Sequence, residues 1–198
     1  MAPRKIGALP PPPTSLDDRD LLIIGCREAL FRIHRVDQDP AFSGKTGLNR
    51  FDAPAGEYGM LYAAIDHHAA FIEVFGDALE RTVRSTFLSE RGWARVEPSR
   101  ELRLVDLSGP GLAQIGADER LCSGEHHVAQ HWSLALWQHR ASVDGLYYRA
   151  RHDPSRMSVA VFDRAESAVT VLRDGGLLDS RNQAVLAAIL ESYQFALL

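Results

Sequence analysis

Residues 47–75, with the sequence GLNRFDAPAGEYGMLYAAIDHHAAFIEVF, contain the succession of elements that decides the fold. The glycines and prolines here and just before break regular structure, which predicts a loop over residues 42–59. The apolar run Met60–Ala64 then predicts a short strand. Asp66 is a suitable helix N-cap, and apolar residues at helical spacing predict a helix to about Leu79. The unit is therefore a loop, a strand and a helix.

The rest of the chain mixes strands and helices without a regular alternation. Strands are expected over residues 29–35, 102–107, 145–149, 158–162 and 168–172. Helices are expected over residues 125–139 and 182–191, with a turn at 109–111 before one short helical turn at 112–116. This order favours an α+β fold, with a mixed central sheet and flanking helices, over a doubly wound parallel sheet. Because neither the GxGxxG nor the GxxxxGK[ST] motif is present, a nucleotide would bind without either common phosphate loop.

The size and composition fit one globular domain. The chain has 198 residues, and its 45% hydrophobic and 24% charged residues are close to the averages of folded proteins. Prolines and then charges fill residues 1–20, which predicts an extended N-terminal arm before one domain over residues 21–198. Such an arm could lie over a partner subunit in a homo-oligomer. The net charge of −4 argues against an electrostatic grip on nucleic acid, so no direct nucleic-acid binding is expected.

The cysteines and the apolar segments indicate a soluble cytoplasmic protein. Cys26 and Cys122 lie far apart and lack metal-ligand or redox spacing, which suits a compartment where thiols stay reduced. Residues 1–13 lack the apolar stretch of a signal peptide. No run of about 18 apolar residues occurs, so no membrane span is expected.

Three histidines raise the alternative of a metal site. His127 and His131 are four residues apart on an expected helix and His126 adjoins them, which is a spacing that zinc sites use. The HExxH motif is missing and no third ligand is evident. We therefore expect no metal, and a surface or core role for these histidines.

Glu73 is a carboxylate in the middle of an apolar stretch of the expected helix. A charge on such a face loses hydration, so it needs a cationic partner, a functional reason or a route to solvent. Arg50, in the glycine-rich loop, could be that partner. Spacing alone leaves two other interpretations open, a purely structural Glu–Arg pair and a glutamate on the wet side of the helix.

Four cationic side chains lie close together in the last third of the chain. They are Arg149, Arg151, His152 and Arg156. They could steer an anionic substrate towards a site. A solvated turn before the next strand explains them equally well.

Six short pieces of the sequence follow one another in the order and approximate spacing of a known family. They are FRIH (31–34), NRFD (49–52), LYAA (61–64), AFIE (70–73), CSG (122–124) and DGLYY (144–148). Together they resemble the RES domain, which is named for its Arg, Glu and Ser. The resemblance spans roughly residues 29–163.

The resemblance implies a fold similar to that of ADP-ribosyltransferases and an activity that consumes NAD, as in toxins of toxin–antitoxin pairs. By position, the family's Arg, Tyr, Glu and Ser are similar to Arg50, Tyr62, Glu73 and Ser123, and an earlier Arg is similar to Arg32. The implied catalytic residues are Arg50, Tyr62 and Glu73. The implied NAD-binding residues are Arg32, Arg50, Tyr62 and Ser123, with NAD as substrate and no metal.

These residue types suit cleavage of the bond between nicotinamide and ribose. The reaction passes through an oxocarbenium-like state, whose positive charge the Glu73 carboxylate would stabilise. Arg32 and Arg50 would bind the pyrophosphate, because a guanidinium donates paired hydrogen bonds and stays charged. Tyr62 could stack on the nicotinamide or ribose and hydrogen-bond through its hydroxyl, and Ser123 could bind the carboxamide or a phosphate.

The chain also departs from the family pattern at several positions. The common motif GGRWN corresponds to LNRFD at residues 48–52, with Phe51 in place of the tryptophan. Some members of the family have an Arg-Tyr pair where this chain has Arg32-Ile33. The late motif YRSR reads YRAR at residues 148–151, so that Ala150 replaces a serine. These departures keep open the alternative of a catalytically degenerate RES domain that acts as a binding partner.

The acceptor of the ADP-ribose and the protein partners are not decided by the residues. Water or phosphate as acceptor would make the chain an NAD glycohydrolase or phosphorylase. A protein side chain as acceptor would make it an ADP-ribosyltransferase that modifies a specific host protein. The resemblance also implies an antitoxin, usually with a helix-turn-helix domain, that blocks the NAD cleft.

Overall fold

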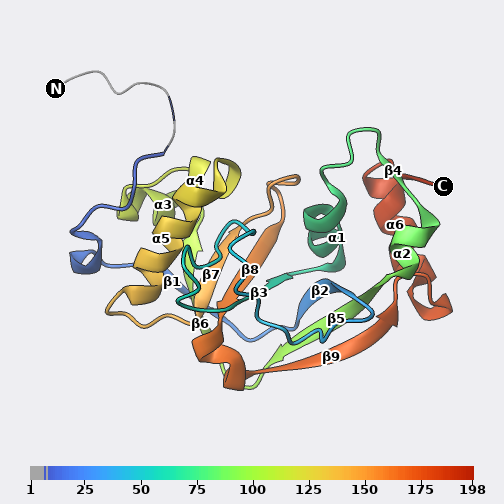
Figure 1. Cartoon of the computed structure of the whole chain (residues 1–198), viewed down its shortest axis with the longest axis horizontal. Coiled ribbons are helices and arrows are strands. Elements are labelled where there is room, and N and C mark those ends of the chain that lie inside the picture. Colours follow the sequence, from blue (N-terminus) through green and yellow to red (C-terminus); the bar gives the residue numbers. More distant parts are fainter. Residues whose placement is uncertain (1–6, 8) are drawn as a thin grey trace.

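The central feature of the computed structural model, which describes residue 7 and residues 9–198, is an eight-stranded sheet (Figure 1). The strand order is β1-β6-β7-β8-β3-β2-β5-β9. The strands are β1 (Ile23–Cys26), β2 (Leu30–Arg35), β3 (Met60–Ala64), β5 (Arg91–Pro98), β6 (Leu102–Leu107), β7 (Gly145–Arg149), β8 (Met157–Phe162) and β9 (Val169–Gly176). Strand β6 pairs in parallel with β7, and the other pairs of this sheet are antiparallel. The predicted α+β class with a mixed central sheet is confirmed.

The sheet opens near its middle, between β2 and β3. These two strands pair at a single position, Phe31 with Ala64, whereas β2 pairs with β5 and β3 pairs with β8 over their full lengths. One half of the sheet therefore consists of β1, β6, β7, β8 and β3, and the other of β2, β5 and β9. The separation leaves room for a pocket between the two halves.

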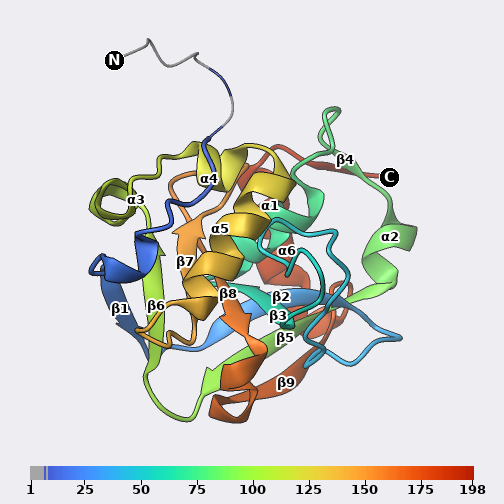
Figure 2. The same ribbon diagram turned by 60° about the vertical axis from the view of Figure 1, so that its left-hand side comes forward.

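The helices gather in two groups over the two halves of the sheet (Figures 1 and 2). One group is α3 (Gly109–Ile115), α4 (Arg120–Ser123) and α5 (His126–Gln138); the other is α1 (His67–Phe75), α2 (Ser85–Ser89) and α6 (Gln183–Ser192). Short 3-10 helices span Leu16–Asp18, Asp163–Ala168 and Ser180–Asn182, and β4 (Thr82–Val83) pairs in parallel with β10 (Ala196–Leu197). Each group has its own core cluster, around Trp132 in the first and around Trp93 in the second.

The helix α1 forms where the sequence predicts it, but it is shorter. The Asp66 carboxylate accepts a hydrogen bond from the backbone N–H of Ala69 (2.8 Å), which confirms the predicted N-cap. The helix ends at Phe75 rather than near Leu79. A side chain at the next residue, Gly76, would overlap the ring of His152, so the close approach of these two segments requires glycine there.

The sequence prediction did not include four strands (β1, β4, β5 and β10), the short helices α2 and α4, or the start of α3. In β5 the charged residues Arg91, Arg95 and Glu97 obscure a strand whose Trp93 and Val96 are buried, and β1 is short and contains a glycine. The helix α3 begins at Gly109, where a turn was predicted, because a proline fits the first turn of a helix. The other predicted strands and helices are present, with bounds that differ by a few residues.

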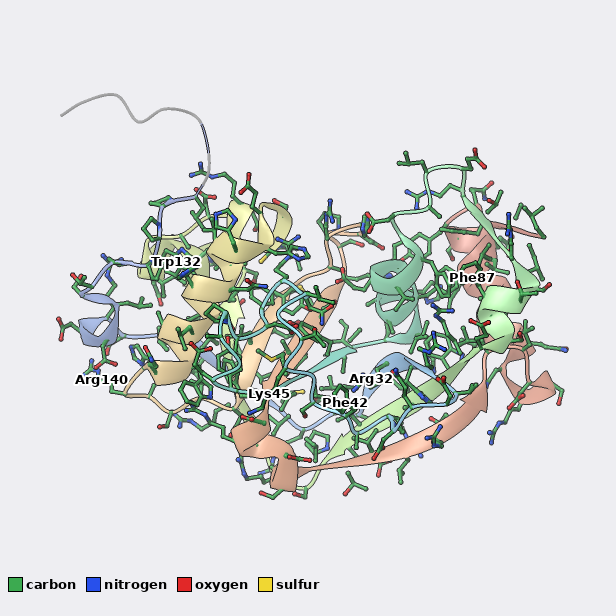
Figure 3. The ribbon with its side chains drawn as sticks, in the orientation of Figure 1. Arg32, Phe42, Lys45, Phe87, Trp132 and Arg140 are labelled. Atoms are coloured by element: carbon green, nitrogen blue, oxygen red, sulfur yellow. The ribbon has the colours of Figure 1, made fainter. Side chains whose placement is uncertain are left out.

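The described part of the N-terminal segment packs on its own chain, contrary to the prediction of an unpacked arm. Leu9 and Leu16 are buried in the first core cluster. Trp132 of α5 donates its indole N–H to the Pro10 carbonyl (2.9 Å) and lies between α5 and this segment (Figure 3). Residues 1–6 and 8 of the predicted arm lie outside the described residues. Within the described chain, no helix is long and apolar enough to cross a membrane.

Candidate active site

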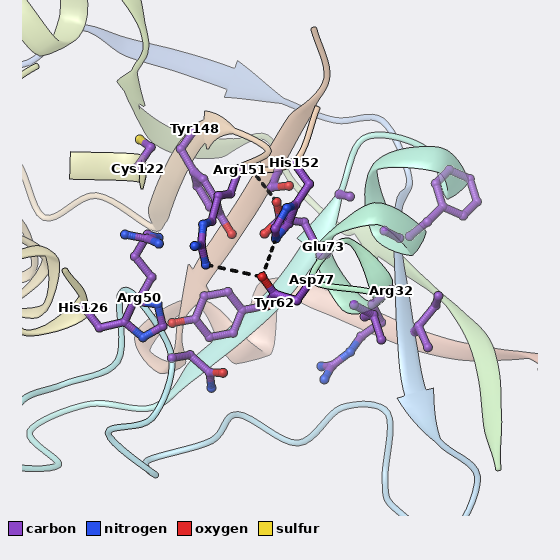
Figure 4. Close-up of a pocket in the computed structure, with 18 residues that line it drawn as sticks. Arg32, Arg50, Tyr62, Glu73, Asp77, Cys122, His126, Tyr148, Arg151 and His152 are labelled. Atoms are coloured by element: carbon purple, nitrogen blue, oxygen red, sulfur yellow. Dashed lines mark hydrogen bonds and ion pairs between the residues drawn. The ribbon is translucent and has the colours of Figure 1, made fainter. Parts of the chain in front are cut away.

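A pocket of about 430 Å³ lies where the sheet opens. Strands β2, β3, β7 and β8 contribute to its floor, and α1 and the start of α5 stand on either side (Figure 4). Its volume falls within the range of small-molecule sites. Arg32, Arg50, Tyr62 and Glu73, all predicted from the sequence, are among its lining residues.

Arg50 is buried and anchored at the α5 side of the pocket. Its Nη1 donates a hydrogen bond to the carbonyl oxygen of Gly124, between α4 and α5 (2.6 Å). Burial lowers the pKa of Arg50, and the nearby Arg151 cation lowers it further, while Glu73 acts in the opposite sense. A buried guanidinium with one anchored nitrogen favours an anionic ligand in the pocket.

The loop that carries Arg50 is organised by the fully buried carboxylate of Asp52. This carboxylate accepts hydrogen bonds from Thr46 Oγ1 (2.9 Å), from the backbone N–H of Asn49 (3.1 Å) and from Asn49 Nδ2 (3.2 Å). It also accepts from the hydroxyl of Tyr62 (2.9 Å). No arginine, lysine or histidine of the described residues forms an ion pair with it, so these donors alone compensate its burial.

Helix α5 holds the same loop from the other side. Gln130, which is buried, donates from Nε2 to the carbonyl oxygens of Gly47 (2.8 Å) and Asn49 (3.0 Å). The Nδ1 atom of His126 lies 3.0 Å from the carbonyl oxygen of Leu48. Gln130 and Asp52 gave no signal in the sequence as supports of the site, because their partners are backbone groups or polar side chains of no fixed spacing.

The hydroxyl of Tyr62 makes two hydrogen bonds inside the protein. It donates to Asp52 Oδ1 and accepts from the backbone N–H of Phe51 (3.0 Å). Burial raises its pKa well above the ordinary value, and the Asp52 charge raises it further. Tyr62 therefore presents its ring to the pocket, and its hydroxyl fixes the loop instead of bonding a ligand.

Glu73 faces the pocket from α1, where its carboxylate is open to the pocket but surrounded by protein atoms. Its Oε1 accepts a hydrogen bond from the backbone N–H of Arg151 (2.7 Å). Burial raises the pKa of Glu73, against the lowering effects of that hydrogen bond and of the Arg50 and Arg151 charges. The Arg50 charge thus acts on the Glu73 carboxylate across the pocket. The two residues are not among the ion pairs within 4 Å of the described residues.

Three further residues line the pocket next to Glu73. Asp77, just beyond α1, lies 3.8 Å from Arg151 Nη1 and 3.3 Å from His152 Nε2, both on the turn between β7 and β8 (Figure 4). Arg151 and His152 belong to the group of basic side chains at residues 149–156 that is evident in the sequence, and the fold places them at the pocket. Asp77 gave no signal in the sequence, because it follows the helix end and its partners lie over 70 residues away.

Arg32 lies at the far end of the pocket. Its guanidinium lies apart from the side chains of Arg50 and Glu73 (Figure 4). Its Nε and Nη1 atoms are buried without a hydrogen-bond partner. Burial lowers its pKa to about 10, against an opposing effect of Asp39. The structure therefore brings together three of the predicted residues and sets Arg32 apart, with unused donors.

Ser123 does not line the pocket. It is the last residue of α4, is exposed, and donates its hydroxyl to the carbonyl oxygen of Glu119 (2.9 Å). Its neighbour Cys122 and, three residues on, His126 line the pocket in its place. The physical reason is the helical turn of α4, which directs consecutive side chains to different sides.

Two of the substitutions relative to the family pattern, Phe51 and Ala150, lie in the core. The Phe51 side chain is fully buried and packs edge-on against Tyr148 (ring centroids 4.8 Å apart), while its carbonyl accepts hydrogen bonds from Tyr58 and Ser133. Ala150 is also fully buried and does not line the pocket. Neither side chain therefore offers the pocket a group that touches a ligand.

The expected helix of the three histidines is α5, and they point to different partners. His127 lies beside Glu125 (3.2 Å), and His131 lies against the carbonyl oxygen of His127 (2.6 Å). Within the described residues, no group of three or more His, Cys, Asp or Glu is arranged to hold a metal ion.

Comparison with models of known protein families identifies the family of this chain. The model of the RES domain matches residues 29–181, which is most of the chain. The chain belongs to the RES domain family. The sequence is also 33% identical over 107 residues to a "Probable toxin y4kH" from Sinorhizobium fredii (strain NBRC 101917 / NGR234), which covers 54% of this chain and 82% of that protein.

The fold of this RES domain is similar to that of a solved structure. The match is to a chain of the M. tuberculosis MbcT-MbcA toxin-antitoxin complex, with a TM-score of 0.64 and 17% identity. It covers 87% of this chain and 94% of that one. The arrangement of strands and helices described above is therefore shared over nearly the whole domain.

Proposed function

We propose that this RES domain is a toxin-type enzyme that consumes NAD by cleaving the bond between nicotinamide and ribose. The observation that carries the proposal is one pocket in which the Glu73 carboxylate faces the Arg50 and Arg151 cations beside the ring of Tyr62. The family membership and the similarity to a protein named as a probable toxin support it.

The chemistry requires a negative charge that stabilises a positively charged ribose. When the bond to nicotinamide breaks, the electron pair leaves with the nicotinamide, which becomes neutral, and the ribose carbon takes on oxocarbenium character. A carboxylate held in place before the reaction stabilises that charge without reorganising. The Arg151 backbone N–H fixes the orientation of the Glu73 carboxylate, and Arg50 and Arg151 favour its ionised form.

The cations of the pocket suit the phosphates of NAD. Arg50 and Arg151 both lie to the left of Glu73 in Figure 4, and Arg32 has two buried guanidinium nitrogens, Nε and Nη1, without an acceptor. A phosphate oxygen at Arg32 would satisfy donors that otherwise lose hydrogen bonds on burial. We therefore retain Arg32, Arg50 and the ring of Tyr62 as NAD-binding groups and Arg50, Tyr62 and Glu73 as catalytic groups, and we drop Ser123.

We also propose that an antitoxin neutralises this enzyme by covering the pocket. The support is the similarity to a chain solved within a toxin-antitoxin complex. A protein that covers the space between α1 and α5 would exclude NAD from Glu73 and Arg50 together. Water, phosphate or a protein side chain could each accept the ADP-ribose, and the products decide among them.

The test is NAD consumption by the purified protein, with product identification by mass spectrometry in the presence and absence of phosphate. Glu73→Gln and Arg50→Ala should each lower the rate by at least about 100-fold, as expected for loss of one electrostatic group at the reacting centre. The exposed Glu80→Gln and Arg27→Ala variants are the matched controls, since neither residue lines the pocket. Absence of both NAD consumption and NAD binding in the folded wild type would contradict the proposal and favour a binding role.

A further inference from the structure

His126 is the first residue of α5 and lines the pocket. The proposed reaction described above assigns no role to its imidazole. Its side chain is exposed to the pocket and extends from α5 towards the space that Arg50 and Tyr62 also line (Figure 4). The neighbouring His127 does not line the pocket and lies beside Glu125. The two adjacent histidines therefore have different surroundings.

The hydrogen bond of His126 decides which ring nitrogen carries the proton. Its Nδ1 lies 3.0 Å from the carbonyl oxygen of Leu48, and a carbonyl oxygen only accepts hydrogen bonds. Nδ1 must therefore be the donor, and in the neutral ring Nε2 is left as the unprotonated nitrogen. Among the hydrogen bonds and ion pairs of the described residues, none involves this Nε2. His126 thus offers the pocket a basic nitrogen.

The loop contact also fixes the ring in place. Leu48 belongs to the loop of Arg50, which Gln130 of the same helix holds through the carbonyls of Gly47 and Asn49. The imidazole is therefore oriented by the same contacts that position Arg50. An oriented base is what proton transfer requires, since the proton must be within hydrogen-bond reach.

The other proton acceptors of the pocket are engaged or protonated. The His152 side chain is only 19% exposed, its ring lies against Gly76 and its Nε2 faces the Asp77 carboxylate at 3.3 Å, whereas His126 is exposed to the pocket. The hydroxyl of Tyr62 already donates and accepts inside the protein. Burial raises the pKa of the Cys122 thiol to about 12, so it stays protonated. Glu73 is assigned to the oxocarbenium charge. His126 is the remaining lining group suited to take up a proton.

We propose that His126 is the general base that activates the water attacking the ribose, an inference that rests on the proposed NAD cleavage. The water oxygen forms a bond to the ribose carbon C1′ as the bond from C1′ to nicotinamide breaks. The electron pair of that bond leaves with nicotinamide, and the proton of the water passes to His126 Nε2. The products are ADP-ribose and nicotinamide, and the proton is later released to solvent.

The decisive variant is His126→Asn, because the asparagine amide can reach the position of Nδ1 and still donate to Leu48, yet it has no basic nitrogen. We expect it to lower the hydrolysis of NAD by about 100-fold or more, the usual contribution of a general base. His127→Asn is the matched control and should keep the wild-type rate. Circular dichroism and thermal melting establish that both variants fold.

Rescue by azide distinguishes a general-base role of His126 from a purely structural one. Azide is an anionic nucleophile with no proton to lose, so its attack on C1′ needs no base and forms 1-azido-ADP-ribose, which mass spectrometry detects. We expect azide to restore NAD consumption in His126→Asn and to leave Glu73→Gln inactive.

Each outcome decides the inference. Unchanged hydrolysis in His126→Asn, a loss that azide does not restore, or a wild type that forms no ADP-ribose from water would each overturn the role of His126. In these cases the proposed NAD cleavage stands as long as the wild type releases nicotinamide in a Glu73-dependent manner. A wild type that neither binds nor cleaves NAD overturns both.

Discussion

The two sides of the pocket are built in different ways. On the α5 side, buried polar groups hold the loop of residues 46–52. They are the carboxylate of Asp52, within the loop, and the side-chain amide of Gln130 on α5. We call this the clamped side. On the α1 side, Glu73, Asp77 and the turn at residues 151–152 meet through contacts that are largely exposed to solvent. We call this the charged side.

The difference teaches how rigidity is distributed around the site. Buried hydrogen bonds that satisfy every partner fix one geometry, because breaking any of them leaves an unsatisfied polar group. Exposed ion pairs contribute little to stability and are screened by salt. We therefore expect the clamped side to hold Arg50 in place before a ligand arrives, and the charged side to adjust around it.

The largest effect on stability should come from Asp52→Asn on the clamped side. One carboxylate oxygen becomes an NH2 group that cannot accept, so a buried donor of the loop loses its partner at a cost of about 2 kcal/mol. The exposed Asp37→Asn variant serves as the control. Urea unfolding measures both, and an Asp52 variant as stable as its control would show that the carboxylate does not organise the loop.

Gln130→Met should give the next largest loss. Methionine fills a similar volume but leaves the carbonyl oxygens of Gly47 and Asn49 without their buried donor, which costs about 1–2 kcal/mol. NAD consumption should fall with stability, because Arg50 shares this loop. The exposed Gln138→Met on the same helix is the control. A stable variant with lowered activity would separate positioning of Arg50 from stability of the fold.

Asp77→Asn on the charged side should change stability by less than about 1 kcal/mol, since Asp77 is 81% exposed. Its charge raises the pKa of His152, against the larger lowering effect of burial, so its removal should lower that pKa further. NMR titration of the His152 ring follows this change. An unaltered His152 titration would mean that the contact between the two residues does not persist in solution.

Glu73→Gln should produce the smallest change in stability, and in the opposite direction. The folded state raises the pKa of Glu73, so above its ordinary value the folded protein binds more protons than the unfolded chain and stability falls as pH rises. The glutamine variant lacks this penalty. Its melting temperature should exceed that of the wild type at about pH 7 and approach it at about pH 4. Equal melting temperatures at both pH values would show that Glu73 is not held in a desolvated site.

Much of the fold was predictable because it depends on local patterns. Alternation or apolar runs located β2, β3, β6, β7 and β8, and Asp66 located the start of α1. The strand β5 was missed because the charged residues Arg91, Arg95 and Glu97 hide its buried positions. The packed N-terminal segment was missed because Leu9 and Leu16 gain their burial only from distant partners.

The sequence by itself determined the family, through the order of short motifs, and it identified Arg50, Tyr62 and Glu73, which the fold brings to one pocket. Only the tertiary structure decided that Ser123 faces away, that Arg32 lies apart, and that Asp52, Asp77 and His126 belong to the site. The physical reason is the sequence separation between the residues that are in contact. Strand and helix signals act over a few residues, whereas these side chains take their roles from strand order and from hydrogen bonds to segments up to 78 residues away.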